Sequence, residues 1–157
     1  MPAPDDVVSL QVGAPPERLY ELVSDITQMP RWSPETYRTR WIRGATRAAP
    51  GARFRGTNRW RWVRWTTTVE VEAADPGREF TFATVLSGRK RTRWSYTFQP
   101  SDGGTLVTES RTSLSVSLVR GNFDRIVMRG HRESYTHGMG ATLERLRTVA
   151  EGGAARS

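Results

Sequence analysis

The chain has 157 residues, a formal net charge of +8 and no cysteine. This length is typical of one domain, and we expect a single domain over residues 1–150 followed by a loose tail over 151–157. The lack of cysteine excludes disulfide bonds, a thiol nucleophile and thiolate metal sites. No signal peptide is recognisable and no apolar run approaches the ~20 residues of a membrane span, so the sequence predicts a cytoplasmic protein.

The first part of the chain predicts one strand and two short helices. Alternating residues from Val7 to Val12 indicate the strand. A helix is expected over 15–23, because proline is tolerated in the first helical turn. A second short helix, capped by Ser24 or Asp25, is expected to end near Met29, because the residue before a proline is disfavoured in a helix.

The middle of the chain predicts six further strands separated by turn signals. Together with the first strand they give seven. The expected ranges are 36–43, 52–62, 65–74, 78–86, 91–99 and 105–114.

A strict two-residue period separates aromatic from charged side chains in the strands expected at 52–62 and 65–74. Because side chains alternate across a strand, one face is expected to be mainly apolar and the other charged. A sheet divided in this way is covered on one face only. We assign Phe54, Asn58, Trp60, Trp62, Trp65, Thr67, Val69 and Val71 to the inner face, and Arg53, Arg55, Arg59, Arg61, Glu70 and Glu72 to the outer face.

Aromatic side chains continue on the next two strands. Phe80 and Phe82 are expected on the same inner face as Trp94 and Tyr96. That pairing requires an odd-length loop or a bulge around 87–89, which the glycine at position 88 permits.

The last third of the chain changes to a helical period. Apolar or amphipathic residues recur every three or four positions over about 122–150, which predicts one long helix. His131 and Tyr135 lie one turn apart on the stripe expected to face the sheet. His137 is expected on the opposite, solvated side, and Gly152 with the glycine after it is expected to end the helix.

The positive charge is concentrated in one fifth of the chain. Residues 36–69 contain nine arginines and no carboxylate, whereas the rest contains fifteen basic and sixteen acidic residues. Arginine interleaved with tryptophan is typical of single-strand nucleic-acid platforms, but the period of two sends rings and cations to opposite faces, so nucleic-acid binding is disfavoured. We favour a solvated cross-strand ion-pair ladder, for example Arg55 opposite Glu72 through a turn near Val63. The alternative is an acidic partner or peripheral membrane surface that binds through Arg38 to Arg64.

The order of elements is that of an α+β helix-grip fold, in which a seven-stranded antiparallel curved sheet wraps a long C-terminal helix. The segments PPERLYELVSD, GARFRG, WSYTF and GGTLVTE occur in this order, with Trp32 and Pro34 after the first. In these segments, over about 7–150, the chain resembles the START-like or SRPBCC superfamily, specifically its polyketide cyclase/dehydrase-like branch. The resemblance implies a deep cavity between sheet and helix that takes lipids, polyketides or aromatic and isoprenoid compounds.

Candidate ligand-binding residues follow from the inner face and the helical stripe. Ligand sites are mostly apolar with a few placed polar groups. Glu109 shares the inward parity of Val107, and a buried glutamate near a histidine is an arrangement suited to general acid/base catalysis. The alternative is that Glu109 pairs with Arg111 and that the histidine is a core residue. The candidate set is Phe54, Asn58, Trp60, Val69, Phe80, Phe82, Trp94, Tyr96, Glu109, His131 and Tyr135.

Other chemistry has no signal in the sequence. The two histidines have no carboxylate in helical register, so no metal site is predicted. No glycine-rich phosphate loop or dinucleotide fingerprint occurs, so no cofactor is predicted. Three functions remain: a carrier of a hydrophobic small molecule, which we favour; a polyketide-type aromatase or cyclase with Glu109, His131 and Tyr135 as catalytic candidates; and an interaction module that uses the arginine-rich face.

Overall fold

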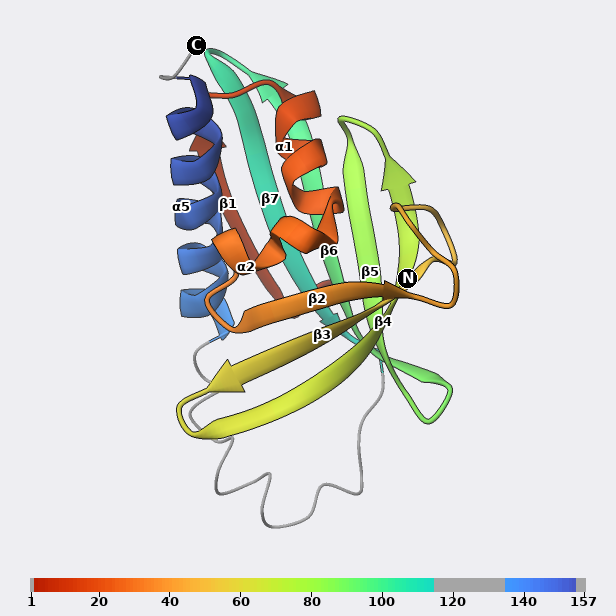
Figure 1. Ribbon diagram of the computed structural model, residues 1–157. Coiled ribbons are helices and arrows are strands. Elements are labelled where there is room, and N and C mark those ends of the chain that lie inside the picture. Colours follow the sequence, from red (N-terminus) through yellow and green to blue (C-terminus); the bar gives the residue numbers. More distant parts are fainter. Residues whose placement is uncertain (1, 115–134, 155–157) are drawn as a thin grey trace.

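The computed structural model describes residues 2–114 and 135–154, which form one sheet flanked by helices. The sheet follows the order β1-β7-β6-β5-β4-β3-β2 and every pairing is antiparallel (Figure 1). This confirms the predicted seven-stranded antiparallel sheet. The elements are β1 (Asp6–Val12), α1 (Pro16–Ser24), the 3-10 helix η1 (Ile26–Gln28), α2 (Met29–Trp32), β2 (Thr36–Ile42), β3 (Arg53–Trp60), β4 (Val63–Asp75), β5 (Glu79–Leu86), β6 (Arg89–Ser101), β7 (Gly104–Ser113) and α5 (Tyr135–Ala154).

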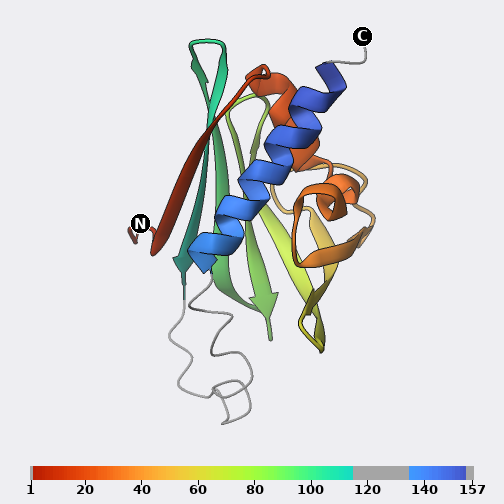
Figure 2. The same ribbon diagram turned by 90° about the vertical axis from the view of Figure 1, so that its left-hand side faces the viewer.

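The helix α5 crosses one side of the curved sheet, with α1 and α2 beside it (Figure 2). It packs against β1, β7, α1 and α2. The buried side chains of Leu143, Leu146 and Ala150 make this contact apolar. The arrangement is the helix-grip fold expected from the sequence.

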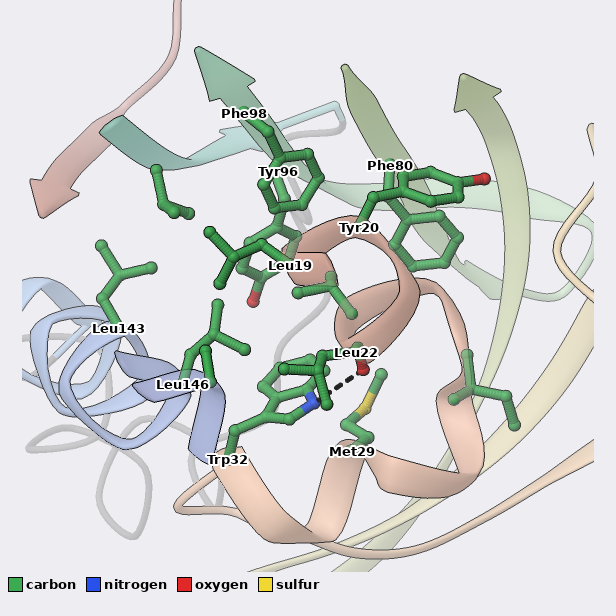
Figure 3. Close-up of a cluster of buried hydrophobic side chains, with 14 of the residues drawn as sticks. Leu19, Tyr20, Leu22, Met29, Trp32, Phe80, Tyr96, Phe98, Leu143 and Leu146 are labelled. Carbon is green, nitrogen blue, oxygen red and sulfur yellow. Dashed lines mark hydrogen bonds between the residues drawn. The ribbon is translucent and has the colours of Figure 1, made fainter. Parts of the chain in front are cut away.

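The core lies where the short helices meet the sheet (Figure 3). Trp32 of α2 is almost fully buried, and its indole Nε1 donates a hydrogen bond to the backbone oxygen of Leu22 at 3.2 Å. This bond satisfies the one polar atom of a large apolar side chain, which fixes α2 against α1. Phe98 meets Tyr20 edge to face with ring centroids 6.2 Å apart.

The predicted division of the sheet into two faces is correct for β3 and most of β4. Phe54 and Val69 are buried and lie opposite each other across the strand pair. Arg55 and Arg59 alternate with them and are exposed. The inner face is therefore apolar and aromatic, and the outer face is cationic.

The turn between β3 and β4 lies earlier than predicted. Trp60 pairs with Val63, so Arg61 and Trp62 form the turn and Trp62 is 73% exposed instead of facing inward. Tight two-residue hairpin turns require positive φ, and Arg61 adopts a φ of 55° there without a glycine to mark the position. As a result Arg55 faces Thr68, and the expected pairing of Arg55 with Glu72 does not occur.

A ladder of ion pairs exists, but with other partners. The carboxylate of Glu70 accepts from the guanidinium of Arg53 at 2.7 Å and lies 3.5 Å from Lys90. Glu72 pairs with Arg93 at 2.9 Å and with Lys90 at 3.6 Å. The ladder thus runs across β3, β4 and β6.

The register change predicted between β5 and β6 is produced by a bulge. Phe82 lies opposite Trp94 as expected, whereas Leu86 lies opposite Arg89 across a two-residue turn. The shift falls at Thr84, whose Oγ1 accepts a hydrogen bond from the backbone N–H of Thr92 at 3.1 Å. The bulge therefore lies within the strands, before the expected position at 87–89.

Two helix boundaries differ from the expectations. Pro30 lies in the first turn of α2, where its missing N–H costs nothing, so it opens this helix instead of ending the preceding one. At the other end of the chain, α5 continues through Gly152 to Ala154. The first part of the helix expected over 122–150, including His131, lies outside the described residues.

Candidate functional site

A cavity of about 530 Å³ lies between the inner face of the sheet and the helices. The sheet side of its wall comes from β3 to β7, and the helix side comes from α2, the segment after it, and the first half of α5. The lining on the sheet side is Phe54, Gly56, Asn58, Arg59, Trp60, Trp65, Thr67, Val69, Phe82, Thr84, Trp94, Tyr96 and Glu109. On the other side it is Met29, Trp32, Ser33, Pro34, Glu35, Thr36, Tyr135, His137, Gly138, Met139, Ala141, Thr142 and Arg145.

The position of α5 explains why this space is open. The helix packs against β1, α1 and α2, and near its end the guanidinium of Arg18 donates to the backbone oxygen of Ala150 at 3.1 Å. Its first half presents the small side of Gly138, Ala141 and Thr142 to the cavity. Because α5 packs on β1 and β7 at one edge of the curved sheet, it leaves the strands toward the other edge uncovered, and the cavity lies there.

Glu109 is the buried acid of this cavity. Its side chain is 2% exposed, and its Oε1 accepts a hydrogen bond from the hydroxyl of Tyr96 at 2.8 Å. Its Oε2 is buried and has no hydrogen-bond partner among the residues that the structure describes. Burial raises the pKa of Glu109 to about 8, although the hydrogen bond from Tyr96 acts in the opposite direction. At neutral pH the group is therefore mainly a carboxylic acid, whose O–H is a donor.

Aromatic rings surround the Tyr96 and Glu109 pair. The ring of Tyr96 meets Trp32 edge to face at 5.8 Å and is stacked with Phe82 at 6.4 Å. Burial raises the pKa of Tyr96 well above its usual value, and the charge of Glu109 adds to this effect. Tyr96 therefore stays a neutral phenol that donates to the carboxyl group and fixes its orientation.

Asn58 forms a second polar position in the cavity wall. Its side-chain oxygen accepts from the hydroxyl of Thr36 at 2.6 Å, and its amide nitrogen donates to the Thr67 hydroxyl at 2.9 Å. These bonds tie β2, β3 and β4 together. The amide nitrogen carries two hydrogens, so one donor is left beyond the Thr67 bond.

Tyr135 closes the wall at the start of α5. Its ring lies edge to face with Trp94 at 6.1 Å, and the guanidinium carbon of Arg111 lies 4.4 Å from its centroid. Arg111 in turn pairs with Asp6 at 2.6 Å. The alternative pairing of Glu109 with Arg111 is therefore wrong, because this arginine is held by β1 and Tyr135.

Most of the residues predicted from the sequence lie in this one cavity wall: Phe54, Asn58, Trp60, Val69, Phe82, Trp94, Tyr96, Glu109 and Tyr135. Phe80 does not, because its side chain is fully buried in the core and does not reach the cavity. His131, the remaining candidate, lies outside the described residues.

Apart from Tyr135, the helix side of the wall was not predicted from the sequence. His137 is exposed as predicted, yet it lines the cavity edge because α5 is oriented with positions 138, 141, 142 and 145 toward the cavity. Met139 and Thr142 lie on the predicted helical stripe, so its periodicity could have identified them as cavity residues. Trp65 and Thr67 had already been assigned to the inner face of the sheet by their strand parity.

No group of three possible metal ligands occurs within residues 2–114 and 135–154. No helix among those residues is long and apolar enough to cross a membrane.

A curved antiparallel sheet, a helix fastened across it and a ring-lined cavity between them define the helix-grip class of proteins. Within that class, residues 7–151 match the family described as polyketide cyclase / dehydrase and lipid transport, and the chain belongs to this family. The match covers nearly the whole chain, as the resemblance seen in the sequence implied.

Solved structures with the same fold come from several bacteria. The polyketide-cyclase-like protein of Corynebacterium glutamicum is 28% identical, with a TM-score of 0.64, over 96% of this chain and 94% of that chain. A protein of Nitrosomonas europaea has a TM-score of 0.71 at 13% identity, over 97% of each chain. A protein of Chromobacterium violaceum has a TM-score of 0.70 at 14% identity, over 95% of this chain and 99% of that chain. The last two support the fold alone. The search of functionally curated proteins gives no match.

Proposed function

We propose that the protein binds and carries a hydrophobic small molecule in the cavity between the sheet and α5. The observation that carries this proposal is a ring-lined space of about 530 Å³ whose wall includes Glu109, a buried acid with one oxygen that has no hydrogen-bond partner within residues 2–114 and 135–154. Small-molecule sites typically enclose ~300–1,000 Å³ and combine apolar walls with a few polar groups.

The polar groups restrict the kind of ligand. Because the pKa of Glu109 is about 8, its acid form offers an O–H donor from inside an apolar wall. The complementary ligand is a lipid, polyketide or aromatic and isoprenoid compound with a carbonyl or hydroxyl oxygen that accepts this bond. A purely hydrocarbon ligand would leave the Oε2 atom unsatisfied, which costs about 1–3 kcal/mol.

The binding test uses a variant that fills the cavity without disturbing the fold. A Cβ at Gly56 would lie 3.6 Å from the Thr36 Cγ2 and 3.9 Å from the Asn58 Oδ1, which are ordinary contacts, so a larger side chain extends into the cavity. Gly56→Leu is the blocking variant, and Thr57→Leu, on the opposite face of the same strand, is the control.

The readouts are native mass spectrometry of the purified protein and the fluorescence of anilinonaphthalene sulfonate. Wild type and Thr57→Leu are expected to carry a small molecule or to bind the probe, and Gly56→Leu is expected to lose both while keeping its thermal unfolding transition. Equal probe binding by a folded Gly56→Leu protein would contradict the proposal.

A second candidate function is cyclisation or dehydration of a polyketide-like substrate, and the neutral buried acid favours it. Glu109 would donate its proton to a substrate carbonyl oxygen as a neighbouring enol carbon forms the new carbon–carbon bond, and would recover a proton from the enol. Tyr96 would hold the carboxyl group in place. If this holds, Glu109→Gln binds the substrate but loses turnover, and the wild-type rate falls as the pH rises past about 8. Turnover that survives Glu109→Gln would exclude it.

A further inference from the structure

The outer face of β2 to β4 carries arginines with no acidic partner among the described residues. We call this set the arginine face: Arg38, Arg40, Arg55, Arg59 and Arg64, all exposed. The carboxylates of the same sheet face, Glu70 and Glu72, are already engaged by Arg53, Lys90 and Arg93. The ion-pair ladder therefore does not neutralise the arginine face.

The register places like charges directly opposite each other on this face. Arg40 lies across from Arg55 in the β2 and β3 pair, and Arg59 lies across from Arg64 in the β3 and β4 pair. Directly opposed like charges destabilise an antiparallel sheet. The arrangement costs folding stability, and an anionic surface bound to this face would compensate that cost.

An exposed indole lies in the turn at the end of two strands that carry these arginines. Trp62, at the turn between β3 and β4, is 73% exposed and follows Arg61. In Figure 1 the tip of this hairpin lies below the lower end of α5. Indole rings next to cations are typical of the boundary between lipid headgroups and acyl chains, where an aromatic side chain is partly buried while its polar edge stays wet.

These features distinguish a lipid surface from a single-stranded nucleic acid. A nucleic-acid platform needs several free ring faces among its cations. Here the guanidinium of Arg61 covers the ring of Trp60 at 4.4 Å, and that of Arg59 lies 5.7 Å from the centroid of Tyr37. One exposed indole in the turn next to a face of arginines instead fits a flat anionic surface.

We propose that the arginine face and Trp62 dock the protein onto a membrane that contains anionic lipids. The arginines contact lipid phosphates and Trp62 enters the headgroup region. Arg59 and Trp60, close to this turn, also line the cavity, so docking would place the cavity edge near the bilayer. The docking itself does not depend on the cavity being occupied.

The test measures partition of the whole protein onto vesicles of phosphatidylcholine, alone or mixed with phosphatidylglycerol. Binding is expected only to the mixed vesicles and to weaken with salt. Arg55→Gln and Arg64→Gln are each expected to lower the partition coefficient about fivefold, the usual contribution of one cation near an anionic surface. Neither should lower thermal stability, since each removes one member of a like-charged pair. Trp62→Ala is expected to lower partition roughly tenfold.

Two control variants match these changes elsewhere on the surface. Arg78→Gln removes one exposed arginine at the other end of β4, after the turn to β5, and Val7→Ala removes an exposed apolar side chain on β1. Both should partition like wild type. Equal losses in Arg78→Gln and Arg55→Gln would overturn the proposal, because net charge alone would then explain binding. Binding to single-stranded RNA that Arg55→Gln and Arg64→Gln abolish, without binding to vesicles, would also overturn it and assign the face to nucleic acid.

Discussion

Glu109→Gln should change how the stability of the protein depends on pH. In the folded chain burial raises the pKa of Glu109 from 4.5 to about 8. Between these two pH values the unfolded chain has released this proton and the folded chain has kept it, so the free energy of unfolding falls as the pH rises. At about 1.36 kcal/mol per pH unit the total loss is roughly 5 kcal/mol, a large part of the stability of a typical domain.

Glutamine imitates the neutral acid and titrates in neither state. Its side-chain oxygen can still accept from Tyr96, and its amide replaces the protonated oxygen. The stability of Glu109→Gln relative to wild type is therefore expected to increase by roughly 5 kcal/mol from about pH 4.5 to about pH 8, and to level off above that. Denaturant unfolding followed by tryptophan fluorescence over this pH range measures the difference.

Glu70→Gln is the control for this experiment. Burial acts to raise the pKa of Glu70, but the hydrogen bond from Arg53 and the charge of Lys90 outweigh it, so its pKa lies below the usual value. Glu70 is therefore charged in both states over most of this range, and its substitution should give a nearly constant difference from wild type above about pH 5. Parallel stability curves for wild type and Glu109→Gln would refute the reasoning that the carboxyl group is buried and neutral.

Two further substitutions test the geometry. Tyr96→Phe removes the hydrogen bond to Glu109, so we expect a loss of about 1–3 kcal/mol in unfolding free energy and a pKa of Glu109 above its wild-type value, both measured by unfolding against pH. Gly104→Ala should prevent stable folding or cost more than about 3 kcal/mol, because its Cβ would meet the Val12 oxygen at 2.1 Å. Gly103→Ala, with a φ of 80° and open space around its Cβ, should cost only about 1–2 kcal/mol, and equal thermal shifts for both would contradict this account.

The inner face of the sheet was predictable because strand parity is strict. Once Val107 is placed inside, Glu109 must follow it, and the same rule puts Phe54 and Asn58 in the wall. Parity does not say how deep a side chain lies. Phe80 and Phe82 share one face of β5, yet Phe80 is sealed in the core and Phe82 reaches the cavity, since α1 covers only one end of that strand.

Turns and helix orientation were less predictable. No glycine marks the turn at Arg61 and Trp62, so the alternation pattern continued past the true end of β3 and assigned Trp62 to the wrong face. The position of His137 at the cavity edge depends on how α5 is rotated against β1. The spacing of apolar residues indicates which side of α5 faces the sheet, but it does not show that the cavity wall extends as far as His137.

The helix α5 is fastened at its two ends by different forces. From its middle onward, Leu143, Leu146 and other apolar groups are packed against the domain. Its first turn is tied to Asp6 of β1 by the Thr136 hydroxyl, and by Arg111, which pairs with Asp6 and lies over the Tyr135 ring. Salt screens the ionic contacts of the first turn and leaves the apolar packing intact. Raising the ionic strength is therefore expected to loosen the first turn of α5 while the apolar contacts hold the rest of the helix in place.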